Sequence, residues 1–485
     1  MNRSEKTIFL VVHQGFEARY LLRTDILHLL KERAKTIVIL TPNADEDYFR
    51  KEFHKNNVVI ERFRSDKCEE YLKKTKGPGI FKIIRSFVLN GRFDIQTLDD
   101  QYKIYKNEAP KKTFEEKIKT ILIHSSIKIL RMSKLLRKLF HWVEVKLFSP
   151  NLHKDLFEKY RPDLVVTTSL GNIGRGYDFF ILREAKRHKV KTVSIILSWD
   201  NTTSKGMAAA RPNHLVAWTD IMQQELIGYH DFPKKKVSIG GIAHFDIYYR
   251  KEKLFSKEDL FHKFDLDLNK KLILFGAKSP TSYPWNAEIV QQIAEAIASG
   301  DISIPSQILV RLHPLYFVYK KDKRAHIHLV DRYEAILKKF PFVKLDKPEI
   351  LSDRLTLDMP ESEQIKLASI LNHTDVLVNI FSTLNIEGSI MDVPTVNIVY
   401  EGEKEKKKRA RQDIQMDFNQ VHNRRVMGTG ALTNCFSPDE LVPSINAYLE
   451  NPTFHREQRQ ALVEQEAGPF RGNAGETITN IIMSL

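Results

Sequence analysis

Short apolar runs alternate with amphipathic segments along most of the chain, and residues 372–400 show this pattern clearly. Residues 376–379 are apolar enough for a buried parallel strand, and Ser382 and Thr383 follow closely. Either hydroxyl can cap the helix expected next, and Pro394 must end that helix. The predicted strand–helix–strand unit would direct N–H groups and hydroxyls to a place where parallel folds bind phosphate, although an ordinary capped helix explains the pattern equally well.

The same alternation predicts two α/β domains with parallel sheets. Residues 250–270 are charged and poor in strand signal, which predicts a linker. We therefore expect a Rossmann-like domain over residues 1–250, a second one over residues 251–465 and a terminal helix over residues 466–485. The strands are expected at residues 7–12, 36–40, 58–63, 164–168, 192–197, 214–218, 237–239, 272–275, 307–312, 376–379 and 395–399.

Residues 65–154 interrupt the alternation with a basic helical insertion in the first domain. Within residues 118–148, apolar side chains such as Leu139 alternate at helical spacing with basic ones such as Lys138. One interpretation is an interfacial helix on an anionic membrane, where each basic residue near the surface adds about 1 kcal/mol. The other is a helix packed on the domain with a solvated basic face, and the sequence leaves both open.

Charge and composition narrow the class of protein. The chain has 485 residues and a formal net charge of +15, which favours an anionic partner such as a phosphate-bearing substrate, an acidic lipid surface or nucleic acid. The distant pair Cys68 and Cys435 offers neither a disulfide framework nor a metal spacing. Residues 1–6 are polar, and no apolar run reaches the roughly 18 residues of a membrane span. We therefore expect a cytoplasmic protein without a signal peptide.

Two α/β domains facing across a cleft suit a group-transfer enzyme, in which one half holds a nucleotide-activated donor and the other an acceptor. His313 ends the strand expected at residues 307–312 and could bind the nucleotide or its phosphate, with charge added by Arg311. His313 could instead be a simple strand-end residue. Glu387 lies about one helical turn beyond Thr383, on a face that could reach a ribose. Residues 401–411 are a charge run, most simply a solvated loop or helix.

A transferase also needs a base that deprotonates the acceptor hydroxyl, and Asp200 is the candidate that we favour. It follows the strand expected at residues 192–197 and lies at the carboxyl edge of the predicted sheet, beside Asn201. The alternative is an Asx turn or a helix cap, both common roles of Asp. Lys205 could bind phosphate, although a lone lysine is usually solvated surface. Asp246 and Glu17 are further candidate carboxylates.

The loop after the first strand is a candidate for the acceptor or the cleft. His13, Gln14 and Gly15 leave the carboxyl end of that strand, where doubly wound folds bind ligands, and glycine permits close backbone approach. A plain turn is the alternative, because the motif is too short for a dinucleotide fingerprint. The glycine-bearing loop at residues 169–176 follows another predicted strand. No His or Cys cluster has zinc spacing, so no metal is expected.

Assembled, these motifs resemble the GT-B glycosyltransferases, and more closely the bacterial poly(glycerophosphate) glycerophosphotransferases and surface-polysaccharide transferases. The Trp-His-Gly-Thr-Pro-Leu-Lys motif of that family is similar to residues 199–205, where Asp200 stands in place of the histidine. Its Arg-x-His-Pro motif matches residues 311–314. Its Tyr-Ser-Ser and Phe-Asp motifs match residues 381–383 and 386–387.

The resemblance implies a metal-independent GT-B enzyme without a cofactor, whose terminal helix crosses back onto the first domain. Because a carboxylate base is common among inverting sugar transferases, Asp200 favours a sugar donor. We expect transfer from a nucleotide-sugar to a hydroxyl of a cell-surface glycan or lipid-linked acceptor, at the inner face of the cell membrane. The alternatives are a phosphopolyol transferase with a CDP donor and an isomerase similar to UDP-GlcNAc 2-epimerase. A basic module that binds nucleic acid is a further alternative, although no nucleic-acid motif is present and that partner is not expected.

Overall fold

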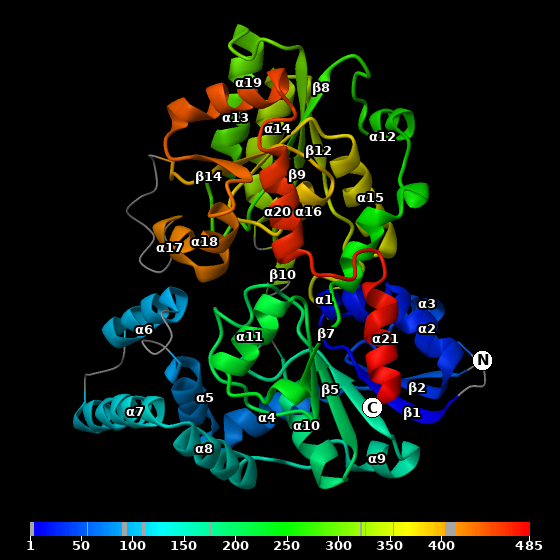
Figure 1. Cartoon of the computed structure of the whole chain (residues 1–485), viewed down its shortest axis with the longest axis vertical. Coiled ribbons are helices and arrows are strands. Elements are labelled where there is room, and N and C mark those ends of the chain that lie inside the picture. Colours follow the sequence, from blue (N-terminus) through cyan, green and yellow to red (C-terminus); the bar gives the residue numbers. More distant parts are fainter. Residues whose placement is uncertain are drawn as a thin grey trace. The chain divides into compact units, whose positions relative to one another are not determined.

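The computed structural model describes residues 4–55, 57–89, 95–108, 113–173, 176–320, 323–324, 326–352, 354–402 and 414–485. Residues 174–175 of the predicted glycine-bearing loop and residues 403–411 of the charge run lie outside the described residues. The contacts divide the chain into two compact units, coloured along the sequence in Figure 1. Unit 1 is Met1–Ala243 with Gln420–His422 and Asn473–Leu485, and unit 2 is His244–Asn419 with Asn423–Gly472.

Unit 1 is built on a parallel seven-stranded sheet in the order β3-β2-β1-β4-β5-β6-β7. Apolar runs form the central strands because parallel strands are covered on both faces. In β1, for example, the last four residues are fully buried. The strands are β1 (Ser4–Val11), β2 (Ala34–Thr41), β3 (Val58–Arg62), β4 (Leu164–Thr167), β5 (Lys191–Ile195), β6 (His214–Ala217) and β7 (Val237–Ile239).

The helices that follow these strands include one from the far end of the chain. Helix α21 (Ala474–Ser484) packs against α2 (Asp25–Arg33) within unit 1. Gly240, just after β7, lets α21 approach the sheet, because a Cβ there would lie 2.8 Å from a side-chain carbon of Ile478. The other helices around the sheet are α1 (Gly15–Glu17), the π-helix η1 (Ala18–Leu22), α3 (Asp47–Phe53), α10 (Asp178–Arg187) and α11 (Asp220–Gly228).

The insertion between β3 and β4 is helical, as predicted, but the stretch expected over residues 118–148 is not one helix. It forms α7 (Phe114–Met132) and α8 (Lys134–Leu147), separated at Ser133. The Ser133 hydroxyl accepts the N–H groups of Leu135 and Leu136, at 3.2 and 3.4 Å, and so starts a new helix. The rest of the insertion is α4 (Ser65–Lys74), α5 (Pro78–Phe87), α6 (Gln96–Glu108) and α9 (Lys154–Tyr160). No helix among the described residues is both long and apolar enough to cross a membrane.

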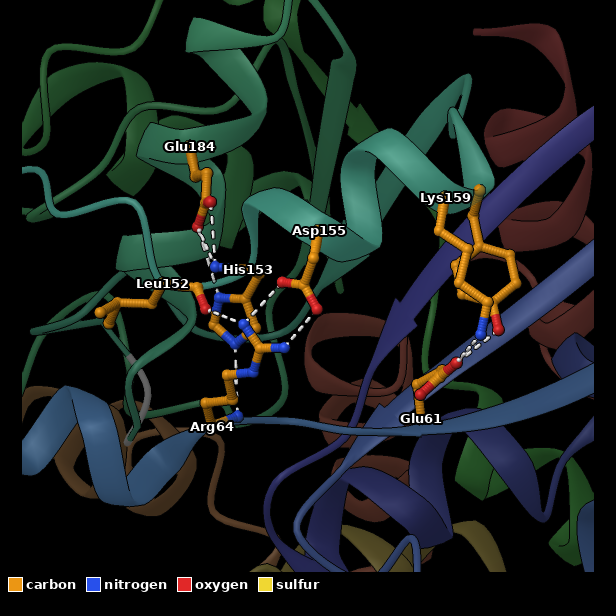
Figure 2. Close-up of polar contacts among 8 residues, drawn as sticks. Glu61, Arg64, Leu152, His153, Asp155, Lys159 and Glu184 are labelled. Carbon is orange, nitrogen blue, oxygen red and sulfur yellow. Dashed lines mark hydrogen bonds and ion pairs between the residues drawn. The ribbon is translucent and has the colours of Figure 1, made fainter.

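The two ends of the insertion are tied together at its base, as Figure 2 shows. Arg64, just after β3, donates to the Leu152 carbonyl (2.5 Å) and to both oxygens of Asp155 (2.7 and 2.5 Å). The His153 ring accepts the N–H of Arg64, and the N–H of His153 donates to both Glu184 oxygens at 3.0 Å. The insertion therefore leaves and rejoins the sheet domain at one fixed point, next to α10.

Unit 2 is built on a parallel six-stranded sheet in the order β12-β9-β8-β13-β14-β15. Four of its strands match predicted positions: β8 (Lys271–Gly276), β9 (Ser306–Arg311), β13 (Val376–Asn379) and β14 (Thr395–Ile398). The edge strands β12 (Val343–Asp346) and β15 (Leu432–Cys435) were not predicted. The hairpin β10 (Tyr319–Lys320) and β11 (Lys323–Arg324) stands apart from this sheet.

The helices of unit 2 cover the sheet and extend into the stretch expected to be a linker. That stretch, residues 250–270, contains the regular helix α12 (Lys257–Phe264), and the contacts place the boundary between the units at Ala243 and His244. The other helices are α13 (Asn286–Ser299), α14 (Val330–Lys339), α15 (Glu361–Asn372), α16 (Leu384–Ile390), α17 (Ile414–Asn419), α19 (Leu441–Glu450) and α20 (Arg456–Glu466). Helix α18 (Val421–Met427) belongs to unit 2 from Asn423 onward.

Candidate active site

In unit 1, an imidazole lies between two carboxylates where β1 ends. His13 follows β1, and α1 brings Glu17 back toward it within one turn. Asp178 starts α10, after the neighbouring strand β4. The Nδ1 atom of His13 lies 2.9 Å from an oxygen of Glu17 and 2.9 Å from an oxygen of Asp178. The side chain of His13 is 6% exposed and that of Asp178 fully buried, so these charges interact away from water.

Backbone donors hold both carboxylates in place. Glu17 accepts the N–H of His13 at 2.7 Å and that of Gln14 at 3.2 Å, while Asp178 accepts the N–H groups of Thr168 and Ser169, each at 3.2 Å. Neither carboxylate is aligned with Nδ1 as a hydrogen bond, so the attraction is mainly between charges. The turn after β1 and the segment after β4 therefore fix two negative charges around one ring.

The cluster is built to hold a proton. Burial lowers the pKa of His13, but the charges of Glu17 and Asp178 outweigh it and raise that pKa well above its usual value. Burial raises the pKa of Glu17, and attraction to His13 offsets this only in part.

The same three groups offer ligand atoms within 4.8 Å of one another, a His, Glu and Asp set of the kind that binds zinc or manganese.

Gly176 lies against the other edge of the imidazole. Its φ of 133° favours glycine, and a Cβ there would fall 1.6 Å from Nε2 of His13. A side chain at this position would therefore displace the ring. Gln14 places its amide nitrogen 3.5 Å from the same Nε2, so two of the three predicted loop residues adjoin the cluster. Sequence reasoning missed Asp178, although an Asp that starts a helix after a parallel strand is a recognisable signal.

Asp200 lies in a different polar setting of unit 1. Its two carboxylate oxygens accept the hydroxyls of Ser198 (2.5 Å) and Ser204 (2.6 Å), and Lys205 lies 3.6 Å away. Burial raises the pKa of Asp200, but Lys205, His422 and the two hydroxyls outweigh it and lower that pKa to about 2. A carboxylate stabilised in this way is a weak base.

The segment around Asp200 is a turn supported by the insertion. The Asp200 carbonyl accepts the N–H groups of Thr203 (3.1 Å) and Ser204 (2.8 Å), which forms a backbone turn, and Asn201 is buried within it. Gly206 permits close approach to α5, because a Cβ there would lie 2.1 Å from the carbonyl oxygen of Arg85. The same carbonyl accepts the N–H of Met207 at 2.8 Å.

In unit 2, His313 follows β9 and is fixed as a neutral donor. Its Nδ1 accepts the N–H of Leu315 at 3.1 Å, so the proton of the neutral ring lies on Nε2. Burial, aided by the charges of Lys278 and Arg311, lowers the pKa of His313 to about 4. The ring can therefore donate one hydrogen bond at neutral pH without carrying a charge.

The loop between β13 and α16 lies at the same sheet edge of unit 2. The Ser382 hydroxyl accepts the N–H of Leu384 at 3.2 Å and so caps the helix, whereas the Thr383 side chain does not cap it. Phe381 has a φ of 39°, which turns the chain sharply after the strand. Lys278, which follows β8, lies 5.5 Å from the centre of the Phe381 ring and pairs with Asp417. Sequence reasoning did not single out this lysine.

The two remaining predicted donor residues of unit 2 are engaged within the unit. Arg311 pairs with Asp346 and, at 3.2 Å, with Glu363. These contacts tie the carboxyl ends of β9 and β12 to α15, and they occupy the guanidinium that was expected to face a phosphate. Glu387 is buried and accepts the hydroxyl of Tyr248.

No protein-family model and no curated protein sequence matches the chain. Solved structures do match it along almost its whole length. A putative UDP-N-acetylglucosamine 2-epimerase from Listeria monocytogenes is 12% identical, with a TM-score of 0.53 over 99% of this chain and 96% of that one. The UDP-GlcNAc 2-epimerases from Methanocaldococcus jannaschii (14% identical) and Neisseria meningitidis (12%, bound to UDP-GlcNAc) each have a TM-score of 0.51 over 99% of this chain and 100% of theirs.

These likenesses and the two parallel sheets establish the two-domain α/β GT-B fold. The predicted fold class is therefore confirmed, and so is the resemblance to GT-B glycosyltransferases at the level of the fold. The identities are too low to carry a substrate or a reaction from those enzymes to this chain.

Proposed function

We propose that the protein is a GT-B glycosyltransferase that moves a sugar from a nucleotide-sugar to an acceptor hydroxyl, with His13 as its base. The observation that carries the proposal is the position of His13 between two buried carboxylates at the carboxyl end of β1. Such folds bind ligands at that end of their strands. Asp200 was the first candidate from the sequence, but its pKa of about 2 makes it the weaker proton acceptor.

In the proposed reaction, the acceptor hydroxyl gives its proton to Nε2 of His13 as its oxygen bonds to the anomeric carbon. The bond from that carbon to the nucleotide phosphate breaks, and the phosphate leaves with the electron pair. Glu17 and Asp178 stabilise the imidazolium that results. The backbone of Gly176 packs against the ring at Nε2, where a Cβ would overlap the imidazole. Gln14, Gly15, Asn201 and Lys205 remain candidates for contact with the acceptor.

Unit 2 is the proposed donor-binding unit. The Nε2–H of His313, the hydroxyls of Ser382 and Thr383 and the ammonium of Lys278 suit an anionic phosphate that gains charge as it leaves. Glu387 is retained as the proposed ribose contact, aligned by Tyr248. The ion pairs of Arg311 fit a role in supporting His313 rather than in binding phosphate directly.

The insertion supports a peripheral position on an anionic membrane, because α8 exposes both lysines and large apolar side chains. Two of its charged residues face the domain: Arg137 is 1% exposed and pairs with Asp231, and Glu144 pairs with Arg183 at 2.8 Å. Its large apolar residues face outward, with Leu135 73% exposed and Trp142 57%. Six more of this kind lie on α7: Phe114, Ile118, Ile121, Leu122, Ile129 and Met132. Exposed apolar side chains among lysines are typical of interfacial helices.

A donor screen tests the transferase. UDP-, GDP-, CMP- and CDP-linked donors are offered with and without hydroxyl acceptors, and release of the nucleotide is followed. Donor consumption that depends on an acceptor and falls in His13→Gln supports the proposal. If the active donor is a CDP-polyol, the predicted phosphopolyol transferase takes its place.

A specific observation keeps the isomerase as a second candidate. An epimerase needs carboxylates and a histidine in one pocket, and His13, Glu17 and Asp178 form such a set. An isomerase would act on the nucleotide-sugar without acceptor and would exchange a carbon-bound hydrogen of the sugar. Incubation in D₂O with donor alone separates the two, because deuterium in the sugar supports the isomerase and its absence alongside acceptor-dependent transfer supports the transferase.

A further inference from the structure

A small basic pocket lies in unit 1, and none of the residues assigned to transfer lines it. Its volume is about 210 Å³, and it lies where the first turns of α8 meet the segments just before β6 and β7. The charged residues in its lining are Lys134, Lys138, Arg211, Lys236 and Asp231. The pocket is smaller than the roughly 300–1,000 Å³ of drug-sized ligand sites, so it suits a phosphate group or two rather than a whole nucleotide-sugar.

The positive charge of the pocket is not balanced by its own lining. Asp231 is the one acid among the lining residues, and Arg137 already holds both of its oxygens at 2.7 and 2.9 Å. Lys134 is 3.9 Å from the same carboxylate and shares it. No acidic residue of the described lining therefore balances the charges of Lys138 and Lys236. A bound anion would reduce the repulsion between these two lysines.

One wall of the pocket is rigid. The guanidinium of Arg211 lies over the Phe232 ring at 4.1 Å and donates to the carbonyls of His230 (3.2 Å) and Asp231 (2.6 Å). Asp231 is in the left-handed region with a φ of 59°, so the segment before β7 turns tightly around this contact. A fixed guanidinium with two flexible lysines is a common way to bind a phosphate.

We propose that this pocket is a phosphate-binding site, distinct from the donor site, at the edge of the apolar face of α8. Leu135 and Leu139 on the exposed face neighbour the pocket lysines along the helix. A phosphate held here would therefore lie beside a surface suited to lipid. Two sources offer this chemistry: the head group of an anionic lipid or lipid-linked acceptor, and a free phosphate compound.

The test uses the full chain and two matched double variants. Lys138→Gln with Lys236→Gln removes the unbalanced charges of the pocket. Lys128→Gln with Lys146→Gln removes two exposed charges from α7 and α8 outside the lining, so the net charge changes equally. One arm measures binding of inorganic pyrophosphate by calorimetry. The other measures cosedimentation with vesicles of phosphatidylcholine, with and without phosphatidylglycerol.

We expect the pocket variant to weaken pyrophosphate binding by at least about tenfold, the effect of losing charged hydrogen bonds, and the control variant to change it by less than about twofold. General attraction to an anionic surface accounts for a loss of roughly fivefold per lysine. If the source is a lipid, the pocket variant should weaken binding to phosphatidylglycerol vesicles by more than this, and the control variant should not. A soluble source predicts that only the pyrophosphate arm separates the two variants.

The proposal is overturned if the wild-type protein does not bind pyrophosphate, or if the two variants change its binding equally. Thermal unfolding of each variant checks that the fold is retained. Because none of the four substituted lysines belongs to the proposed transfer residues, a negative result here leaves the transferase proposal standing. A failed donor screen would equally leave the phosphate site standing.

Discussion

The imidazole–carboxylate cluster of unit 1 gives the sharpest prediction. If His13 is the base, kcat/KM should rise with pH, because only the unprotonated imidazole can accept the proton of the acceptor hydroxyl. Glu17 and Asp178 raise the pKa of His13, so the rise should lie on the alkaline side of the usual histidine range. Glu17→Gln removes one of the two negative charges, so the pKa of His13 falls and the whole rise moves to lower pH. Asp178→Asn should move it in the same direction.

The expected magnitudes follow from the contacts. Each carboxylate lies 2.9 Å from Nδ1, where the attraction is about 6 kcal/mol at an effective dielectric constant of about 20, before the opposing cost of burial. The attraction lost with either charge is therefore large enough to shift the pH profile of kcat/KM measurably. Removal of the base itself, in His13→Gln, should lower kcat by about 10²–10⁴-fold.

The assay is a set of initial rates between pH 5.5 and 9.5 with the donor that the screen identifies. His13→Gln leaves two buried carboxylates without their cation and should cost about 3–5 kcal/mol of stability, so urea unfolding accompanies each rate. The double variant His13→Gln with Glu17→Gln removes the repulsion between the two buried carboxylates. If His13→Gln does not fold, the double variant can be used to measure the effect of losing the base. A pH profile that stays in place in both Glu17→Gln and Asp178→Asn refutes the assignment of His13, even if both variants are less active.

Three further predictions follow from other contacts. Asp200→Asn should lower kcat by less than about tenfold, because the pKa of Asp200 is already about 2 and it acts as an acceptor of hydroxyls; a fall as large as that of the base variant would restore Asp200 as the base. His313→Ala should raise the donor Kd by about 10–100-fold through the loss of one hydrogen bond to a charged phosphate. The donor affinity of the wild-type protein should not change between pH 5.5 and 8, since the pKa of His313 is about 4. Titration calorimetry measures both. Asp231→Ala should cost about 3–5 kcal/mol in urea unfolding because it leaves Arg137 buried without its partner, and a loss below about 1 kcal/mol would show that the pair is solvated.

The fold was largely predictable because its central strands are buried on both faces. Strands such as β1 and β13 carry continuous apolar runs and were expected within a few residues of where they lie. The strands β12 and β15, which form the two edges of the unit 2 sheet, were missed. An edge strand is covered less completely, and the middle residues of both are only partly buried, so neither shows a continuous apolar run.

The candidate site was predictable residue by residue but not as an arrangement. The sequence singled out His13 and Glu17 separately, one as a loop residue and the other as a spare carboxylate. Asp178 is distant along the chain, and it reaches His13 only because β1 and β4 are neighbours in the sheet. The pairing of strands decides this contact, and strand order cannot be read from local periodicity.

The helical insertion shows most clearly that hydrophobic periodicity does not determine how a helix is oriented on its domain. Spacing along residues 118–148 establishes that one face is apolar and another charged, but it does not determine which face turns inward. In α8 the buried partners decide: Arg137 meets Asp231, and Glu144 meets Arg85 and Arg183, all within unit 1. Buried charges are stable only when paired, so these contacts fix Arg137 and Glu144 toward the domain, while the lysines and the large apolar residues of α8 stay exposed. The orientation of α8, and with it the proposed attachment to a membrane, therefore depends on residues far away in the sequence rather than on the helix itself.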